Sequence, residues 1–91
     1  MANEGRKRTL IDTKGRLEKQ SIDINRDMER KATEVNKLRI EHQKQNTTDS
    51  RRKSIVSKVT MLEKDLVNLR AKLEKNNKDY NKAHVELIKL S

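Results

Sequence analysis

The fold is decided by the C-terminal stretch, in which residues 55–90 read IVSKVTMLEKDLVNLRAKLEKNNKDYNKAHVELIKL. Apolar residues recur in this stretch at alternating steps of three and four residues, the heptad spacing of a coiled coil. Such spacing places one narrow apolar seam on a helix, and the seam stays exposed to water until a second helix covers it. We therefore expect residues 55–91 to form a heptad coiled coil whose oligomerisation residues are Ile55, Val59, Leu62, Leu66, Leu69, Leu73, Asn76, Tyr80, Ala83, Leu87 and Leu90.

Charged residues beside this seam set the expected orientation of the two helices. In a parallel pair in register, Lys58 would face Glu63 and Asp65 would face Arg70 of the neighbouring chain, and neither contact is repulsive. Asn76 is the amide within the seam, and it either fixes the register by pairing across the interface or is a tolerated polar defect. We expect a parallel homodimer, with the role of Asn76 left open.

Residues 9–45 carry the same seven-residue rhythm in a weaker form. The seven-residue column here runs through Leu10, Leu17, Ile24, Lys31 and Leu38. Three positions after each of these residues the side chain is polar, whereas four positions after some of them it is apolar. We expect an N-terminal helical segment over residues 9–45 with a displaced apolar seam, because an insertion of a few residues into a heptad pattern has this effect. The seam supplies the expected binding stripe for another protein, formed by Ile24, Met28, Val35 and Leu38.

Residues 46–54 separate these two patterns and form the expected irregular or hinge segment. The run NTTDS at positions 46–50 competes with the helical backbone for hydrogen bonds, so it marks either a frayed patch in one long helix or the turn between two helices. Neither Gly nor Pro occurs here, and the seven-residue column continues across the segment. We therefore favour an all-α, elongated coiled coil with one irregular region, and keep as the alternative a helical hairpin that assembles into a bundle.

Two short basic runs lie outside the regular pattern. Residues 1–8, with the run RKR at positions 6–8, contain no periodic apolar positions, so we expect a flexible basic N-terminus and a helix that starts at Thr9. The second run, RRK at positions 51–53, precedes Ser54 in a pattern that resembles the site of a basophilic protein kinase. Ser54 is therefore a candidate phosphorylation site, where a phosphate would add about −1.5 to −2 charge.

Composition argues against an enzyme. The 91 residues include 31% hydrophobic residues and a single aromatic residue, whereas typical globular domains contain about 45–50% apolar residues. Little apolar material is left to enclose a concave, water-excluding site. The chain has no Cys, and neither His42 nor His84 has a partner at a spacing typical of metal ligands. We expect no catalysis, no cofactor and no metal site.

Hydropathy and charge indicate the environment and the partners. No apolar run is long enough for a membrane span or a secretory signal, so we expect an intracellular protein without choosing between cytoplasm and nucleus. The net charge is +9, with the basic excess spread over both halves of the chain. A basic-region zipper protein carries an uninterrupted basic surface directly before its heptads. Here that stretch contains Glu34, Glu41 and Asp49, which would repel phosphate, so we do not expect sequence-specific readout of DNA.

Two functions from different classes follow from these observations. The first is a non-enzymatic coiled-coil protein that acts as an oligomerisation module, scaffold or spacer, pairs with itself and recruits another protein through its N-terminal half. The alternative is a basic helical rod that binds an acidic polymer, either nucleic acid or a cytoskeletal filament, without sequence specificity. Salt dependence separates the two, because binding driven by counterion release weakens steeply as salt rises.

Overall fold

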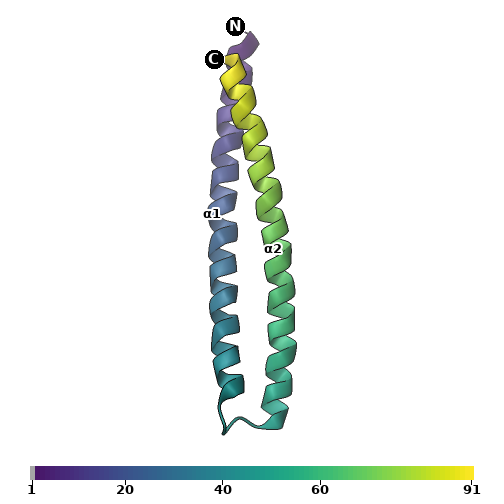
Figure 1. Ribbon diagram of the computed structural model, residues 1–91. Helices are drawn as coiled ribbons and strands as arrows, with labels where there is room; N and C mark the ends of the chain where they lie inside the picture. The colour runs from purple at the N-terminus through teal and green to yellow at the C-terminus, as the bar shows by residue number, and fades with distance from the viewer. Residues whose placement is uncertain (1) are drawn as a thin grey trace. The chain divides into compact units, whose positions relative to one another are not determined.

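The computed structural model describes residues 2–91 of the chain, so that Met1 lies outside the described residues. These residues form two α-helices, α1 (Ala2–Gln43) and α2 (Asp49–Leu90), and contain no strand. A loop over residues 44–48 joins the two helices (Figure 1). The expected all-α fold is confirmed, and the chain adopts the hairpin alternative.

The continuous helix through residues 46–54, which the seven-residue column favoured, is not formed. α1 ends at Gln43, and α2 begins at Asp49, so that residues 49–54 already belong to the second helix. The cause is local competition for hydrogen bonds, because the Thr47 hydroxyl donates to the backbone carbonyl of Glu41 across 2.7 Å. The parallel homodimer and the bundle concern several chains and stay predictions.

α1 begins at Ala2, seven residues before the expected start at Thr9. The Thr9 hydroxyl does not cap a helix end and instead donates to the Gly5 carbonyl, one turn earlier, across 3.0 Å. Arg6 makes two hydrogen bonds to the carboxylate of Glu86 on α2, at 2.8 and 2.7 Å. This contact helps to hold the first turns of α1 in helical form although Gly5 has a low helix propensity. The expected flexibility of residues 1–8 stays a prediction, and residue 1 lies outside the described residues.

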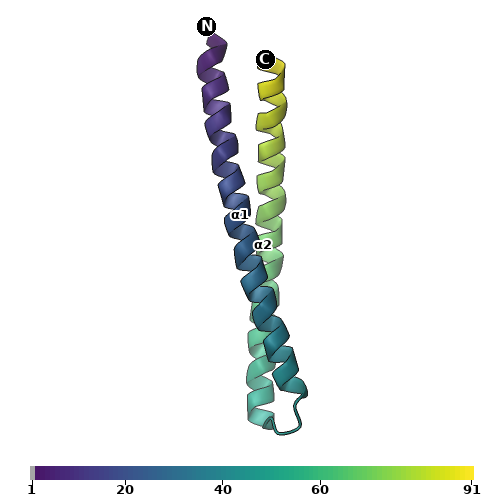
Figure 2. The same ribbon diagram turned by 90° about the vertical axis from the view of Figure 1, so that its left-hand side faces the viewer.

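The chain divides into two compact units, and each helix contributes one segment to each of them. Unit 1 contains residues 2–25 of α1 and residues 71–91 at the end of α2, and unit 2 contains residues 26–70 with the loop. In unit 2 the last turns of α1 and the first turns of α2 meet at the loop (Figure 2). Within each unit the two helical segments therefore run antiparallel.

The core of unit 2 lies between its two helical segments. Val35 and Leu38 of α1 are buried, as is Ile55 of α2, which is only 1% exposed. The remaining seam residues are half-buried, namely Met28, Lys31 and His42 on α1 and Val59, Leu62, Leu66 and Leu69 on α2. The α1 seam of unit 2 is thus regular, with its own steps of three and four residues. It is displaced only in comparison with the heptad positions of α2.

The core of unit 1 follows the same pattern with more polar residues. Leu10 and Leu17 of α1 and Ala83 of α2 are buried, together with the amide of Asn76. Half-buried seam residues complete the contact surface, namely Lys14, Ser21 and Ile24 on α1 and Leu73, Tyr80, Leu87 and Leu90 on α2. Each unit has only two helical segments, so a seam residue has one neighbouring helix to pack on.

Candidate functional site

The expected oligomerisation residues all lie on the α2 surface that packs on α1 of the same chain. Ile55, Asn76 and Ala83 are buried there, and none of the others is fully exposed. Unit 2 contains Ile55, Val59, Leu62, Leu66 and Leu69, and unit 1 contains Leu73, Asn76, Tyr80, Ala83, Leu87 and Leu90. The first helix therefore occupies the seam that the sequence assigned to a second chain. A role for these residues between chains stays a prediction.

The expected partner-binding stripe is divided between the two units. Val35 and Leu38 are buried in unit 2 and Met28 is half-buried there, whereas Ile24 is half-buried in unit 1. In each unit these residues lie on the α1 surface that packs on α2. The stripe is thus largely covered within a single chain, and binding of another protein to it stays a prediction.

Asn76 is held by two hydrogen bonds inside unit 1. Its Nδ2 atom donates to the Leu17 carbonyl and to the Ser21 hydroxyl, both across 2.8 Å, and the residue is only 6% exposed. A shift of one helix along the other would leave this amide buried without partners, at a cost of about 1–3 kcal/mol. The arrangement fits the register-fixing role more closely than a tolerated defect, with Ser21 of the same chain as the partner.

A polar cluster follows one turn further along unit 1. The Lys14 ammonium lies 2.9 Å from His84 Nδ1 and 5.2 Å from the centre of the Tyr80 ring, which stacks on the His84 ring at 6.2 Å. The Tyr80 hydroxyl donates to the Glu18 carboxylate across 2.9 Å, and this bond raises the pKa of Tyr80. Because an ammonium can only donate, His84 Nδ1 accepts the hydrogen bond from the Lys14 ammonium. The contacts of this cluster hold the Lys14 side chain along the edge of the seam.

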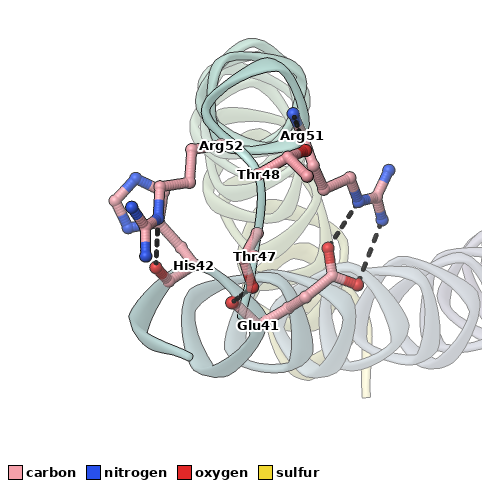
Figure 3. Close-up of polar contacts among 6 residues, drawn as sticks. All are labelled: Glu41, His42, Thr47, Thr48, Arg51 and Arg52. Atoms are coloured by element: carbon pink, nitrogen blue, oxygen red, sulfur yellow. Dashed lines mark hydrogen bonds and ion pairs between the residues drawn. The ribbon is translucent and has the colours of Figure 1, made fainter. Parts of the chain in front are cut away.

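The turn in unit 2 is closed by side chains that satisfy the end of α1 (Figure 3). The Arg52 guanidinium donates to the backbone carbonyls of His42 and Lys44, at 3.3 and 2.9 Å, while Thr47 serves the Glu41 carbonyl. The last carbonyls of a helix have no partner within it, so these bonds replace the usual glycine cap. Arg52 is therefore a structural residue of the turn.

The start of α2 is capped within the same turn. The Thr48 hydroxyl accepts a hydrogen bond from the Arg51 backbone N–H across 3.1 Å, as an N-cap residue does. The Arg51 side chain reaches back to Glu41 on α1 and donates to both carboxylate oxygens (Figure 3). This pair lowers the pKa of Glu41 and raises that of Arg51. Glu41 and Arg51 thus join the two helices beside the loop.

Positive charge is concentrated at this turn. Residues 37–58 contain seven Lys or Arg against two acidic residues, Glu41 and Asp49, a net charge of +5 out of the +9 of the whole chain. Arg39, Arg51 and Arg52 each pair with a carboxylate. Among the described residues no carboxylate lies within 4.0 Å of the other four side chains, which are exposed and which we name the turn lysines: Lys37, Lys44, Lys53 and Lys58.

Sequence reasoning identified the basic run RRK at positions 51–53 but missed the wider concentration, because it compared the net charge of the two halves of the chain. The turn lies at the boundary between the halves, so each half carries part of the cluster and the excess looks even. A count in a window centred on the predicted hinge would have found it. Ser54, the candidate phosphorylation site, is exposed on α2 within the same region, and its modification stays a prediction.

Neither a metal site nor a membrane span is found in the described part of the chain. No three His, Asp or Glu side chains there are grouped in a way that could hold a metal ion. Residues 2–91 also contain no helix that is long and apolar enough to cross a membrane. No protein family, curated protein or solved structure shows significant similarity to the chain.

Proposed function

We propose that the protein is a non-enzymatic interaction protein, a helical hairpin that pairs with a second copy of itself and so acts as an oligomerisation module or scaffold. The observation that carries the proposal is the incomplete burial of its apolar residues. In unit 2 the seam residues Val59, Leu62, Leu66 and Leu69 are only half-buried, because α1 is the single helix available to cover them. A second hairpin would supply the missing neighbours.

The exposed surface is large enough for such an association. The chain exposes 7278 Å², whereas a folded chain of 10.7 kDa that buries a typical share of its surface exposes about 5,500 Å². The difference of about 1,800 Å² exceeds the ~800 Å² that each partner contributes to a standard interface. Burial of part of this surface between two copies would bring the exposed area of each chain close to the expected value.

A groove in unit 2 is the favoured contact surface. It is lined on α2 by Ile55, Val56 and Val59, and it is flanked by Arg39 of α1 and Glu63 of α2, so we name it the valine groove. Val56 is 54% exposed, and Val67, which follows three turns later on the same side of α2, is 63% exposed. These apolar side chains offer an uncovered edge beside the seam.

The charges around the valine groove favour a second copy as its occupant. Arg39 and Glu63 form an ion pair within the chain, and both side chains remain about half exposed. In a two-fold symmetric pair the same patch meets itself, so Arg39 of one copy can also approach Glu63 of the other. A surface with one positive and one negative group at its rim is complementary to itself, whereas an acidic partner would meet repulsion from Glu63.

Sedimentation equilibrium of the full chain tests the proposal. The variant V56N/V67N removes two exposed valines from the groove side, and I40N/M61N removes two exposed apolar residues from other sides of unit 2 as a matched control. Each substitution acts twice in a symmetric pair, so burial of about 1 kcal/mol per valine predicts a dissociation constant at least about 100-fold weaker for V56N/V67N.

We expect the wild-type chain to be a dimer and the control to stay within about threefold of it, a change of less than 1 kcal/mol. A wild-type chain that remains monomeric at about 1 mM, which corresponds to binding weaker than about −4 kcal/mol, would overturn the proposal. Equal weakening by both variants would overturn the assignment of the contact to the valine groove.

A further inference from the structure

We propose that the turn lysines form a binding site for the phosphate backbone of double-stranded nucleic acid, without sequence preference. The site is the turn of unit 2, where Lys37 of α1, Lys44 of the loop, and Lys53 and Lys58 of α2 lie within a few helical turns of the loop. None of the turn lysines lines the valine groove, and binding to them does not depend on self-association.

Charge is the first argument for this site. Arg39 and Arg51 are neutralised by Glu63 and Glu41, so the free positive charge of the turn belongs mainly to the turn lysines. Four exposed ammonium groups around one chain reversal raise the local potential and attract a polyanion. Asp49 opposes this attraction, but Arg52 lies 3.7 Å from its carboxylate and offsets its charge.

The charged groups left open at the turn can bind phosphate. A lysine ammonium is a compact point charge that binds phosphate without demanding a fixed geometry, whereas the planar guanidinium forms bidentate pairs with carboxylate or phosphate. Here the guanidinium groups are already used inside the fold and the ammonium groups are left open. Phosphate and sugar contacts also come from neutral amides and hydroxyls, and the turn exposes several: Gln43, Gln45, Asn46, Thr48, Ser50 and Ser54.

The same residues disfavour other polyanions. Residues 37–58 contain no Phe, Tyr or Trp, and the ring of His42 is half-buried, so single-stranded bases would find little surface to stack on. The loop residues 44–48 are Lys, Gln, Asn and Thr, and none of them is an apolar side chain that could enter a lipid interface. A duplex, which presents a dense row of phosphates and hides its bases, is the polyanion that such a surface fits best.

Fluorescence anisotropy with a labelled DNA duplex of mixed sequence tests the site. In the turn variant, K37Q/K44Q/K53Q/K58Q, all four turn lysines are removed. A matched control, K72Q/K75Q/K78Q/K82Q, removes four exposed lysines of α2 in unit 1 that also have no carboxylate within 4.0 Å among the described residues. Both variants lower the net charge from +9 to +5, because each loses four lysines. Circular dichroism checks that both remain helical.

Four phosphate contacts predict that wild-type binding weakens about 100-fold between 50 and 200 mM salt. We expect the turn variant to bind at least about tenfold more weakly at 50 mM salt and to lose most of this salt dependence, with the control within about threefold of wild type. Equal losses in both variants would show attraction by net charge alone and overturn the site. No binding at 50 mM salt, or tighter binding to anionic lipid vesicles than to the duplex, would overturn the assignment to nucleic acid.

Discussion

Replacement of Ile55 by Ala removes the most deeply buried side chain among the described residues, which is 1% exposed in the core of unit 2. Truncation of a buried Ile to Ala costs about 2–5 kcal/mol, through lost apolar burial and the cavity left behind. We expect about 2–3 kcal/mol, since the neighbouring Val59 is only half-buried and the valine groove lets the site collapse partly. A loss of 2 kcal/mol lowers the folding equilibrium constant by roughly 30-fold.

Urea denaturation followed by far-ultraviolet circular dichroism measures this loss. The measurement is made at a protein concentration where sedimentation shows a single species, because association adds to apparent stability. Met61→Ala serves as the control, because Met61 is 68% exposed on the same helix and its truncation should change stability by less than about 0.5 kcal/mol. A loss below 0.5 kcal/mol for Ile55→Ala, or equal losses for both variants, would refute the packing described for unit 2.

Three further changes follow from contacts in the two units. Gly15→Ala should stabilise the protein by about 0.5–1 kcal/mol in urea denaturation, because Gly15 lies inside α1 and its added methyl group would meet no atom within 4 Å. The lowered pKa values of Glu41 and Glu86 stabilise the fold above the unfolded-state value of about 4.3, and this stability is lost as pH falls through the lower folded-state pKa. E41Q/E86Q should therefore show a smaller loss of urea midpoint between pH 7 and pH 3 than the wild type, and an unchanged loss would contradict the ion pairs. Ultraviolet titration should show Tyr80 ionising above its ordinary pKa of about 10, and Glu18→Gln should move this pKa back toward that value. Because the folded-state pKa is raised, the associated stability is present below about pH 10 and is lost as pH rises through the raised folded-state pKa.

Much of the packing surface could be predicted from the sequence, because heptad spacing depends only on which residues share one face of a helix. The columns through Ile55 and Ala83 on α2, and through Val35 on α1, are the columns that the structure buries. The spacing does not say which helix covers a seam, and both halves of the chain carry one. The sequence therefore left open whether the second helix comes from the same chain or from another.

Two factors decide whether the helix that covers α2 comes from the same chain or from another chain. One is loop closure, and the other is a set of charges that can pair in either arrangement. A loop over residues 44–48 costs little entropy to close, and it holds the second helix at a high effective concentration. Glu63 and Asp65, which were expected to pair with Lys58 and Arg70 of another chain, lie within 4.0 Å of Arg39 and Lys31 of the same chain. Their charges are thus compatible with both orientations and could not decide between them.

The turn cluster was hidden for a similar reason. Glu41 and Arg51 are ten residues apart in the sequence and meet only because the chain reverses between them. The concentration of the turn lysines also depends on that reversal, which the absence of Gly and Pro made hard to foresee. The capping bonds from Arg52 to two backbone carbonyls explain how the chain turns without those residues.

The central claim is that α1 covers α2 of the same chain in an antiparallel register, and cross-linking tests it most directly. The chain has no cysteine, so S21C/N76C introduces the only two thiols, at the positions joined by a 2.8 Å hydrogen bond in unit 1. The account predicts that mild oxidation of a dilute sample yields a disulfide within one chain, seen by mass spectrometry as an unchanged monomer mass less two hydrogens. Dimers linked between the two position-76 thiols, as a parallel pair of α2 helices would give, would contradict it.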